Sequence, residues 1–121
     1  MVNTIQIGHH GEDIAVEYLR GAGYMIAARN WRSARYEIDI VAERAGITHL
    51  IEVKTRRAGS LSTPESTITR TKALAMRRAA AAYLAQCRVR GEVEFDLLAV
   101  DMFPDGSYDV RFIQNVAEIG W

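Results

Sequence analysis

The chain has 121 residues, no net charge, and an ordinary composition of 49% hydrophobic and 25% charged residues. A chain of this length can bury roughly two-thirds of its unfolded surface, which favours one soluble domain over residues 1–121. Its single cysteine, Cys87, excludes an intramolecular disulfide and fits the reducing cytoplasm. The first residues lack the pattern of a signal peptide, and the least polar segment carries two arginines, so we expect no membrane span.

The charges are distributed unevenly along the chain. Residues 1–28 carry a net charge of −2, residues 29–90 of +8 and residues 91–121 of −6. A basic middle between acidic ends indicates a surface that faces a polyanion, although scattering of these charges over all faces is equally consistent with charge alone. Thirteen of the fifteen basic residues are Arg, so Lys54 and Lys72 stand out, because Lys is the cation whose pKa proteins tune.

Hydrophobic periodicity and turn residues predict seven elements in chain order. We expect a helix over residues 11–21, strands over 24–30, 36–43 and 47–54, a helix from an N-cap at Thr69 to about Gln86, and strands over 92–100 and 107–113. Ala45-Gly46 and the segment 104–106 form turns. The order α-β-β-β-α-β-β predicts an α/β domain, with helices on the faces of a mixed sheet.

Glu12 is the first candidate for a functional role. It lies at helical spacing before Ala15, Val16 and Leu19, so its side chain projects with the apolar face of the first helix. The alternative is a carboxylate that only stabilises the N-terminal end of the helix dipole.

The segment "YEIDIVAERAGITHLIEVKTR", residues 36–56, places charged residues inside two apolar strands. Side chains alternate along a strand, so Glu37 and Asp39 share one face, as do Glu52 and Lys54. A hairpin register in which paired residue numbers sum to 91 puts Asp39 opposite Glu52. A sum of 90 puts the two pairs on opposite faces, and the sequence leaves this choice open.

These four residues have two interpretations. They could form the solvent face of a hairpin with weak cross-strand salt bridges. The apolar neighbours Val41 and Leu50 instead suggest that both faces are covered, where unpaired polar groups cost several kcal/mol. Neighbouring carboxylates repel one another, and a divalent cation such as Mg²⁺, Ca²⁺ or Mn²⁺ removes that penalty. With a lysine beside them, they have the groups needed for metal-assisted phosphodiester hydrolysis.

The chain resembles the PD-(D/E)XK nuclease superfamily, and within it the YraN family of small proteins similar to Holliday-junction resolvases. Asp39, then twelve intervening residues, then "EVK" at 52–54, resembles the superfamily signature. The blocks "GEDIAVEYL", "GYMIAARNWR", "EIDIVA", "IEVKTR" and "EFDLLAV", with Lys72 opening a helix, follow the YraN pattern in order. The chain departs from that pattern at Tyr36, where Gly is usual, and at Glu94, where Arg is usual.

The resemblance implies a restriction-endonuclease-like mixed sheet flanked by helices, with the active site on the second and third strands. It implies that Asp39 and Glu52, with Glu12, bind Mg²⁺ or Mn²⁺, and that Lys54 is the catalytic lysine. Glu37 also matches a motif position, with no role assigned. Arg56 and Lys72 match positions near substrate phosphates. The partner implied is DNA, including branched DNA, whose two-fold junctions would suit a homodimer.

Other residues have competing interpretations. Arg29, Asn30 and Arg32, around Trp31, could grip phosphates and stack a base, or form a solvated turn. Arg70 on the second helix is a further candidate for phosphate contact. His49 falls on the face of Ile51 and Val53, which is typical of a packed or edge histidine. At the level of function, the alternatives to a nuclease are a non-catalytic nucleic-acid-binding module and a structural or protein-interaction domain.

Overall fold

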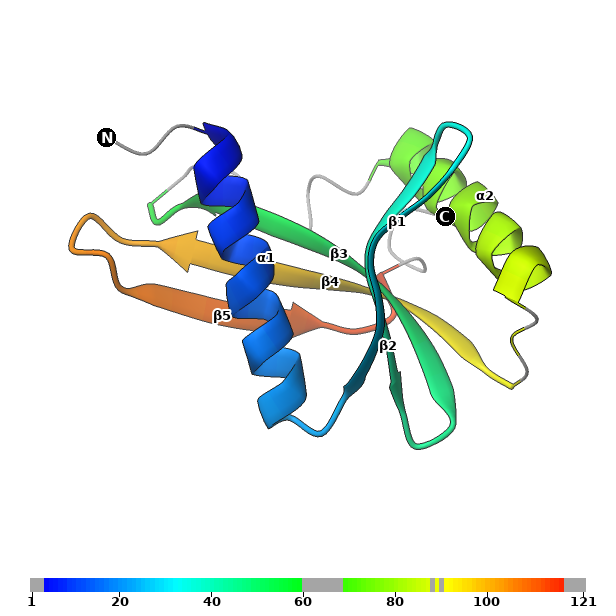
Figure 1. Ribbon diagram of the computed structural model, residues 1–121. Helices are drawn as coiled ribbons and strands as arrows, with labels where there is room; N and C mark the ends of the chain where they lie inside the picture. The colour runs from blue at the N-terminus through cyan, green and yellow to red at the C-terminus, as the bar shows by residue number, and fades with distance from the viewer. Residues whose placement is uncertain (1–3, 60–68, 88, 90, 117–121) are drawn as a thin grey trace.

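A computed structural model describes residues 4–59, 69–87, 89 and 91–116. The elements are α1 (Thr4–Gly21), β1 (Met25–Ser33), β2 (Tyr36–Arg44), β3 (Ile47–Arg57), α2 (Arg70–Cys87), β4 (Val93–Met102) and β5 (Tyr108–Ile113). The strands form one sheet in the order β1-β2-β3-β4-β5, with β3 and β4 parallel and the other neighbours antiparallel. This confirms the expected α/β order and mixed sheet (Figure 1). Neither described helix is long and apolar enough to cross a membrane.

Helix α1 begins at Thr4, earlier than the predicted start at Gly11. Gly11, the predicted boundary, lies within the helix at a close approach to β3. A Cβ atom at Gly11 would lie 1.9 Å from Oγ1 and 3.0 Å from Cβ of Thr55. The glycine is therefore required by packing between the helix and the sheet. The predicted end at Gly21 is confirmed, and Tyr24 N–H then donates to the carbonyl of Leu19 at 2.9 Å.

Two cores cover opposite faces of the sheet. On one face α1 buries Ile14, Ala15, Val16 and Leu19 against the sheet. On the other face α2 buries Ala79, Ala80 and Tyr83. The neighbouring β3 residues Leu50 and Ile51 belong to different cores, because successive strand residues point to opposite faces. This confirms the expectation that both faces of the hairpin are covered, and Figure 1 shows α1 crossing the strands.

The β2–β3 hairpin adopts the register that the sequence left open. Its pairs run from Arg44–Ile47 to Ile40–Ile51, so paired residue numbers sum to 91. Ala45 and Gly46 both have positive φ, 51° and 80°, as a tight type I′ turn requires. Past Ile40–Ile51, β2 continues beside β1 and β3 continues beside β4. The two strands therefore separate where Asp39 faces Glu52.

The β1–β2 hairpin bends toward α2. Strand β1 carries an irregularity between Ile26 and Ala28, and Asn30 has a φ of 51°. The half-buried Trp31 ring then meets the Tyr83 ring edge-on at 5.2 Å. Residues 29–32 consequently lie within a strand that extends to Ser33, beyond the predicted end and not in a turn.

Helix α2 begins as predicted. Lys72 N–H donates to Oγ1 of Thr69 at 3.1 Å, which confirms Thr69 as the N-cap. The N-cap fixes the first turn of the helix, and Lys72 stands in that turn. Lys72 is therefore held at the end of α2 that lies near β3.

Candidate functional site

Asp39 lies at the point where β2 and β3 separate. Its Oδ2 atom accepts a hydrogen bond from Val53 N–H at 2.9 Å, so the side chain satisfies a backbone donor of β3. Burial raises the pKa of Asp39 from 3.8 to about 6; the Val53 hydrogen bond opposes this, while the charges of Glu52, Glu12 and Glu37 add to it. Asp39 therefore lies in the field of three other carboxylates, in a site where a negative charge is disfavoured.

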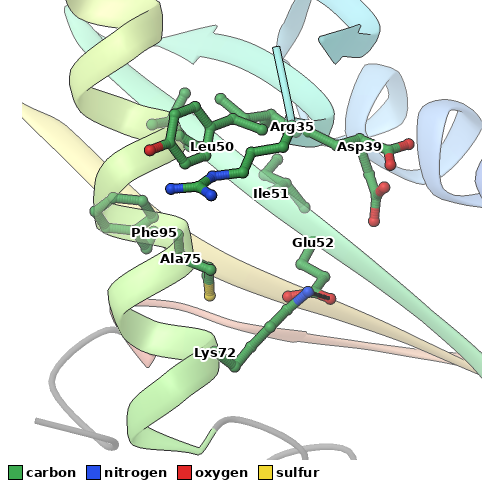
Figure 2. A pocket seen from close by; sticks show the side chains of 13 residues that line it. Arg35, Asp39, Leu50, Ile51, Glu52, Lys72, Ala75 and Phe95 are labelled. Carbon is green, nitrogen blue, oxygen red and sulfur yellow. Dashed lines mark ion pairs between the residues drawn. The ribbon is translucent and has the colours of Figure 1, made fainter. Parts of the chain in front are cut away.

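Glu52 faces α2 from the next strand. Its Oε1 atom lies 2.8 Å from Nζ of Lys72, and Figure 2 shows these two side chains pointing toward each other, with Asp39 on the side away from α2. The Oε2 atom of Glu52 is buried and has no hydrogen-bond partner among the residues described. One half of this carboxylate is therefore balanced by an ammonium group, and the other half is not.

Glu12 reaches the same region from α1. Its side chain is half-buried, and its Oε1 atom is buried without a hydrogen-bond partner in the described part of the chain. Its charge contributes to the raised pKa of Asp39. The close contact of the preceding Gly11 with Thr55 brings this turn of α1 onto β3. The inward projection expected from helical spacing is thus what the structure shows.

Lys54 and Glu37 lie toward the outside of this cluster. Lys54 is exposed, pairs in register with Ala99 of β4, and shares a face of β3 with Glu52. Glu37 is exposed, and its Oε1 atom lies 3.3 Å from Nη2 of Arg32. The structure therefore brings Glu12, Asp39, Glu52 and Glu37 within electrostatic reach and leaves Lys54 open to a ligand from solvent.

A pocket of about 270 Å³ opens beside these carboxylates, between the β2–β3 strands and α2. Asp39, Glu52 and Lys72 contribute the polar atoms nearest the strand separation, and Arg35 lies at another wall (Figure 2). The rest of the lining is largely apolar and consists of Tyr36, Glu37, Ile38, Leu50, Ile51, Ala75, Met76, Ala79 and Phe95. The pocket therefore offers Asp39, Glu52 and Lys72 at one end, and mainly apolar side chains together with Arg35 elsewhere.

Most of the candidate phosphate-binding residues have acidic partners within the chain. Arg29 pairs with Asp13 at 2.8 Å, and Arg56 pairs with Asp101 at 3.0 Å. The Nη1 atom of Arg56 is nevertheless buried without a hydrogen-bond partner in the described structure. Asn30 and Arg70 are exposed. Asn30 and Arg70 are therefore open to solvent, whereas Arg29 and Arg56 are already paired with acids.

A second polar cluster escaped the sequence analysis. His49 is buried, as expected for a packed histidine, but its Nδ1 atom lies 2.5 Å from Oδ2 of Asp96 and 3.3 Å from Oε2 of Glu94. Burial raises the pKa of Asp96, and hydrogen bonds from Asn115 and His49 oppose this. Glu94 and Asp96 are two residues apart on β4, so the sequence itself indicates that they share one face of the strand. Their pairing with β3 was not visible, because parallel strands are joined through a distant connection.

The His49 cluster could hold a metal ion. One ligand atom from each of His49, Glu94 and Asp96 lies within 4.8 Å of the others, and among the described residues this is the one such group of three or more His, Cys, Asp and Glu residues. Glu12, Asp39 and Glu52 are spaced more widely than that. The described structure therefore offers two separate candidate sites for the expected metal ion.

The fold and the carboxylates together define the class: an α/β domain with a mixed sheet and a charged site where two strands separate. The family described as "Uncharacterised protein family UPF0102" matches residues 11–100. The chain belongs to that family, which confirms the resemblance to the YraN family. The matched span includes the carboxylate cluster and the His49 cluster.

Relatives named only as UPF0102 proteins occur in distant bacteria. One from Symbiobacterium thermophilum is 40% identical over 113 residues, covering 91% of this chain and 94% of the relative. One from Nocardia farcinica is 42% identical over 99 residues, covering 81% and 78%. One from Bacteroides thetaiotaomicron is 38% identical over 115 residues, covering 95% and 94%. The similarity extends over most of the chain and carries no named activity.

Proposed function

We propose that this protein is a metal-dependent nuclease that hydrolyses phosphodiester bonds in DNA, including branched DNA. The observation that supports it most is a pair of buried carboxylate oxygens, Oε1 of Glu12 and Oε2 of Glu52, that have no hydrogen-bond partner among the described residues. Both side chains also raise the pKa of Asp39 by their charge. A stable fold rarely leaves such atoms without a partner unless a ligand completes the site. A cation is the ligand that three carboxylates would attract.

The donor set fits Mg²⁺ or Mn²⁺. Asp39, Glu52 and Glu12 offer hard oxygen ligands, which these ions prefer, and the open pocket leaves room for water and phosphate. The bound ion would supply Lewis acidity toward a phosphoryl oxygen. The ion would also offset the repulsion that contributes to the raised pKa of Asp39.

The side chains of the protein supply the rest of the chemistry. Lys54, exposed on the same face of β3 as Glu52, would orient the attacking water and stabilise negative charge that develops on the phosphate. Asp39 is held in place by Val53 N–H, so its position is fixed before substrate arrives. The apolar pocket wall would limit water on the α2 side.

The DNA backbone would be held by basic and amide side chains of β1, β3 and α2. The candidates are Arg29, Asn30 and Arg32 on β1, Arg56 on β3, and Arg70 and Lys72 on α2. Arg and Asn side chains commonly contact phosphates and fix orientation without reading sequence.

Two copies related by a two-fold axis would match the symmetry of a four-way junction, and sedimentation with and without junction DNA tests that arrangement.

A cleavage assay tests the activity. The wild-type protein, Asp39→Asn and Lys54→Ala would each meet a four-way junction, a flap and linear duplex DNA, with Mg²⁺, Mn²⁺ or EDTA. We expect cutting that depends on the metal and falls by about 10²-fold or more in both variants, because each removes a group that acts in the transition state. Glu17→Gln and Arg20→Ala, at exposed positions of α1, are the matched controls and should cut like the wild type.

The other outcomes separate the remaining functions. Cutting in EDTA, or cutting that both variants retain, would reject the assignment of these residues. Absence of cutting with salt-sensitive binding that survives Asp39→Asn would indicate a non-catalytic nucleic-acid-binding module. Absence of binding at moderate salt would indicate a structural or protein-interaction domain.

A further inference from the structure

We propose that His49, Glu94 and Asp96 form a separate structural site for a divalent transition metal, with Zn²⁺ as the reference ion. The ion would bind between β3 and β4 and hold the end of β5 through the backbone at Asn115. This site is independent of the proposed Mg²⁺ or Mn²⁺ site and of the nuclease activity.

The two sites take their β3 ligands from opposite faces of that strand. His49 shares its face of β3 with Ile51, which packs in the α1 core, and its ring meets the edge of Tyr24 at 5.0 Å. Glu52 lies on the other face and contacts Lys72 of α2. A cation held by His49 therefore cannot also be held by Glu52.

The charges of the cluster are unbalanced. A single ring nitrogen, Nδ1 of His49, faces both carboxylates, and one N–H group cannot make a good hydrogen bond to each of them. The exposed fractions of the side chains are 4% for His49, 0% for Asp96 and 23% for Glu94. The Oε2 atom of Glu94 points at this nitrogen, is buried, and has no hydrogen-bond partner among the described residues. Buried charges of this kind are normally paired or bound to a metal.

The spacing suits a tetrahedral ion. Zn²⁺ bonds of about 2.0–2.2 Å to nitrogen and oxygen place neighbouring ligand atoms about 3.3 Å apart. The distance from Nδ1 of His49 to Oε2 of Glu94 is 3.3 Å. Oδ2 of Asp96, at 2.5 Å from Nδ1, would move outward by roughly 0.8 Å to reach this geometry. Both distances from the histidine nitrogen are therefore within about 1 Å of tetrahedral spacing, and all three ligand atoms lie within 4.8 Å of one another.

The surroundings support the ligands and leave one position open. Oδ1 of Asp96 accepts a hydrogen bond from Asn115 N–H at 3.1 Å, which orients Oδ2 toward the histidine. The partial exposure of Glu94 provides a route for the ion and space for a water as fourth ligand. An imidazole nitrogen in the set favours Zn²⁺ and similar transition ions over Mg²⁺.

Zinc titration of protein stripped of metal with EDTA and then freed of EDTA tests the site. We expect calorimetry to find one tightly bound Zn²⁺ per chain and thermal denaturation to show a higher Tm with Zn²⁺. Glu94→Gln should weaken the affinity at least tenfold and lose most of the Tm increase. Glu94→Gln changes the most exposed ligand by one atom, so it should fold. His49→Gln is compared only if its circular dichroism matches that of the wild type.

Matched variants distinguish this site from the proposed catalytic one. Asp39→Asn and Glu52→Gln should keep the tight Zn²⁺ site, because both residues lie outside it. Replacing Zn²⁺ with Co²⁺ should give the strong visible absorption of tetrahedral coordination in the wild type and lose it in Glu94→Gln. Failure of the wild type to bind Zn²⁺, or binding unchanged in Glu94→Gln, would overturn the proposal and identify the cluster as a buried hydrogen-bonded charge group. Neither result bears on DNA cleavage.

Discussion

Asp39 shows how a single side chain can take over the role of a strand partner. Where the β2–β3 pairing stops, Val53 N–H would lack an acceptor from β2, and Oδ2 of Asp39 provides one. A buried carboxylate at this position has a raised pKa, about 6, because burial and the neighbouring acids outweigh that hydrogen bond. The residue is therefore positioned by the fold and destabilised in its ionised form.

The ionisation of Asp39 predicts a pH-dependent effect of Asp39→Asn on stability. Between pH 3.8 and about 6 the folded state holds one more proton at this site than the unfolded state does, so stability falls as pH rises through this window. The full shift corresponds to at most about 3 kcal/mol, and solvent at the open side reduces it. We expect Asp39→Asn, in EDTA, to be more stable than wild type by about 1–2 kcal/mol above pH 6.

Urea denaturation at several pH values measures this difference. The gain should shrink as pH falls and vanish below about pH 4, because both side chains are then neutral. Asn retains an oxygen that can accept from Val53 N–H, so the comparison isolates the charge. A gain of the same size at every pH would show that packing, and not ionisation, is responsible.

At the scale of elements, the contact between α1 and β3 determines where Glu12 stands. Gly11 lets the helix approach Thr55 closely, and rotation of the threonine would not relieve the clash of an added methyl group, because its Cβ atom would also be only 3.0 Å away. Helix propensity alone would favour Ala at this position by about 1 kcal/mol. The close contact outweighs that preference.

Gly11→Ala should therefore destabilise the protein by about 1–2 kcal/mol, as overpacking at a tight contact does. Chemical denaturation measures the change. Gly21→Ala is the matched control, because a Cβ there would meet no atom within 4 Å, and its effect should stay within about 0.5 kcal/mol. Equal effects of the two substitutions would contradict the assigned role of the contact.

The elements themselves could be predicted from the sequence, with their boundaries less well defined. Alternating apolar residues and the Ala45-Gly46 turn identified β2 and β3, and Thr69 identified the start of α2, because these signals are local. The predicted start of α1 at Gly11 was wrong, because a glycine inside a helix looks the same in sequence as one at its end. Only the structure shows that Gly11 faces Thr55.

At the scale of the whole molecule, long-range pairing limited the prediction of the site. The register that sets Asp39 opposite Glu52 differs by one residue from an alternative that the sequence allowed equally. His49 and Asp96 lie 47 residues apart and meet through the parallel β3–β4 pairing. No local pattern reports such a pairing, so the second cluster could be found only in three dimensions.

The arrangement of charge over the molecule predicts a salt effect on DNA binding. Arg32 and Arg35 lie by the tip of the β1–β2 hairpin, which contacts α2 where Gln86 donates to Ser33. If this end faces DNA, replacing both with Gln should reduce the magnitude of the slope of log K against log salt by about 2, measured in EDTA by fluorescence anisotropy.

A matched double variant tests the location of that surface. Arg20 lies in the last turn of α1, and Arg44 stacks on Tyr24 beside the β2–β3 turn, so both lie away from the hairpin tip. Replacing both with Gln removes the same charge and should leave the slope nearly unchanged. A similar loss of slope in the two double variants would mean that net charge alone governs binding.

The ion pair between Lys72 and Glu52 has a consequence for how ligands cooperate. The ammonium group lies 2.8 Å from Oε1 of Glu52, so a cation at the other oxygen, Oε2, would be repelled by its positive charge. Under the proposed function, a phosphate that draws Lys72 away would increase the affinity of Glu52 for the cation, and a cation on Glu52 would release Lys72 toward phosphate. Linkage requires each ligand to strengthen the other by the same factor. The site would thus hold its metal weakly alone and firmly once nucleic acid is present.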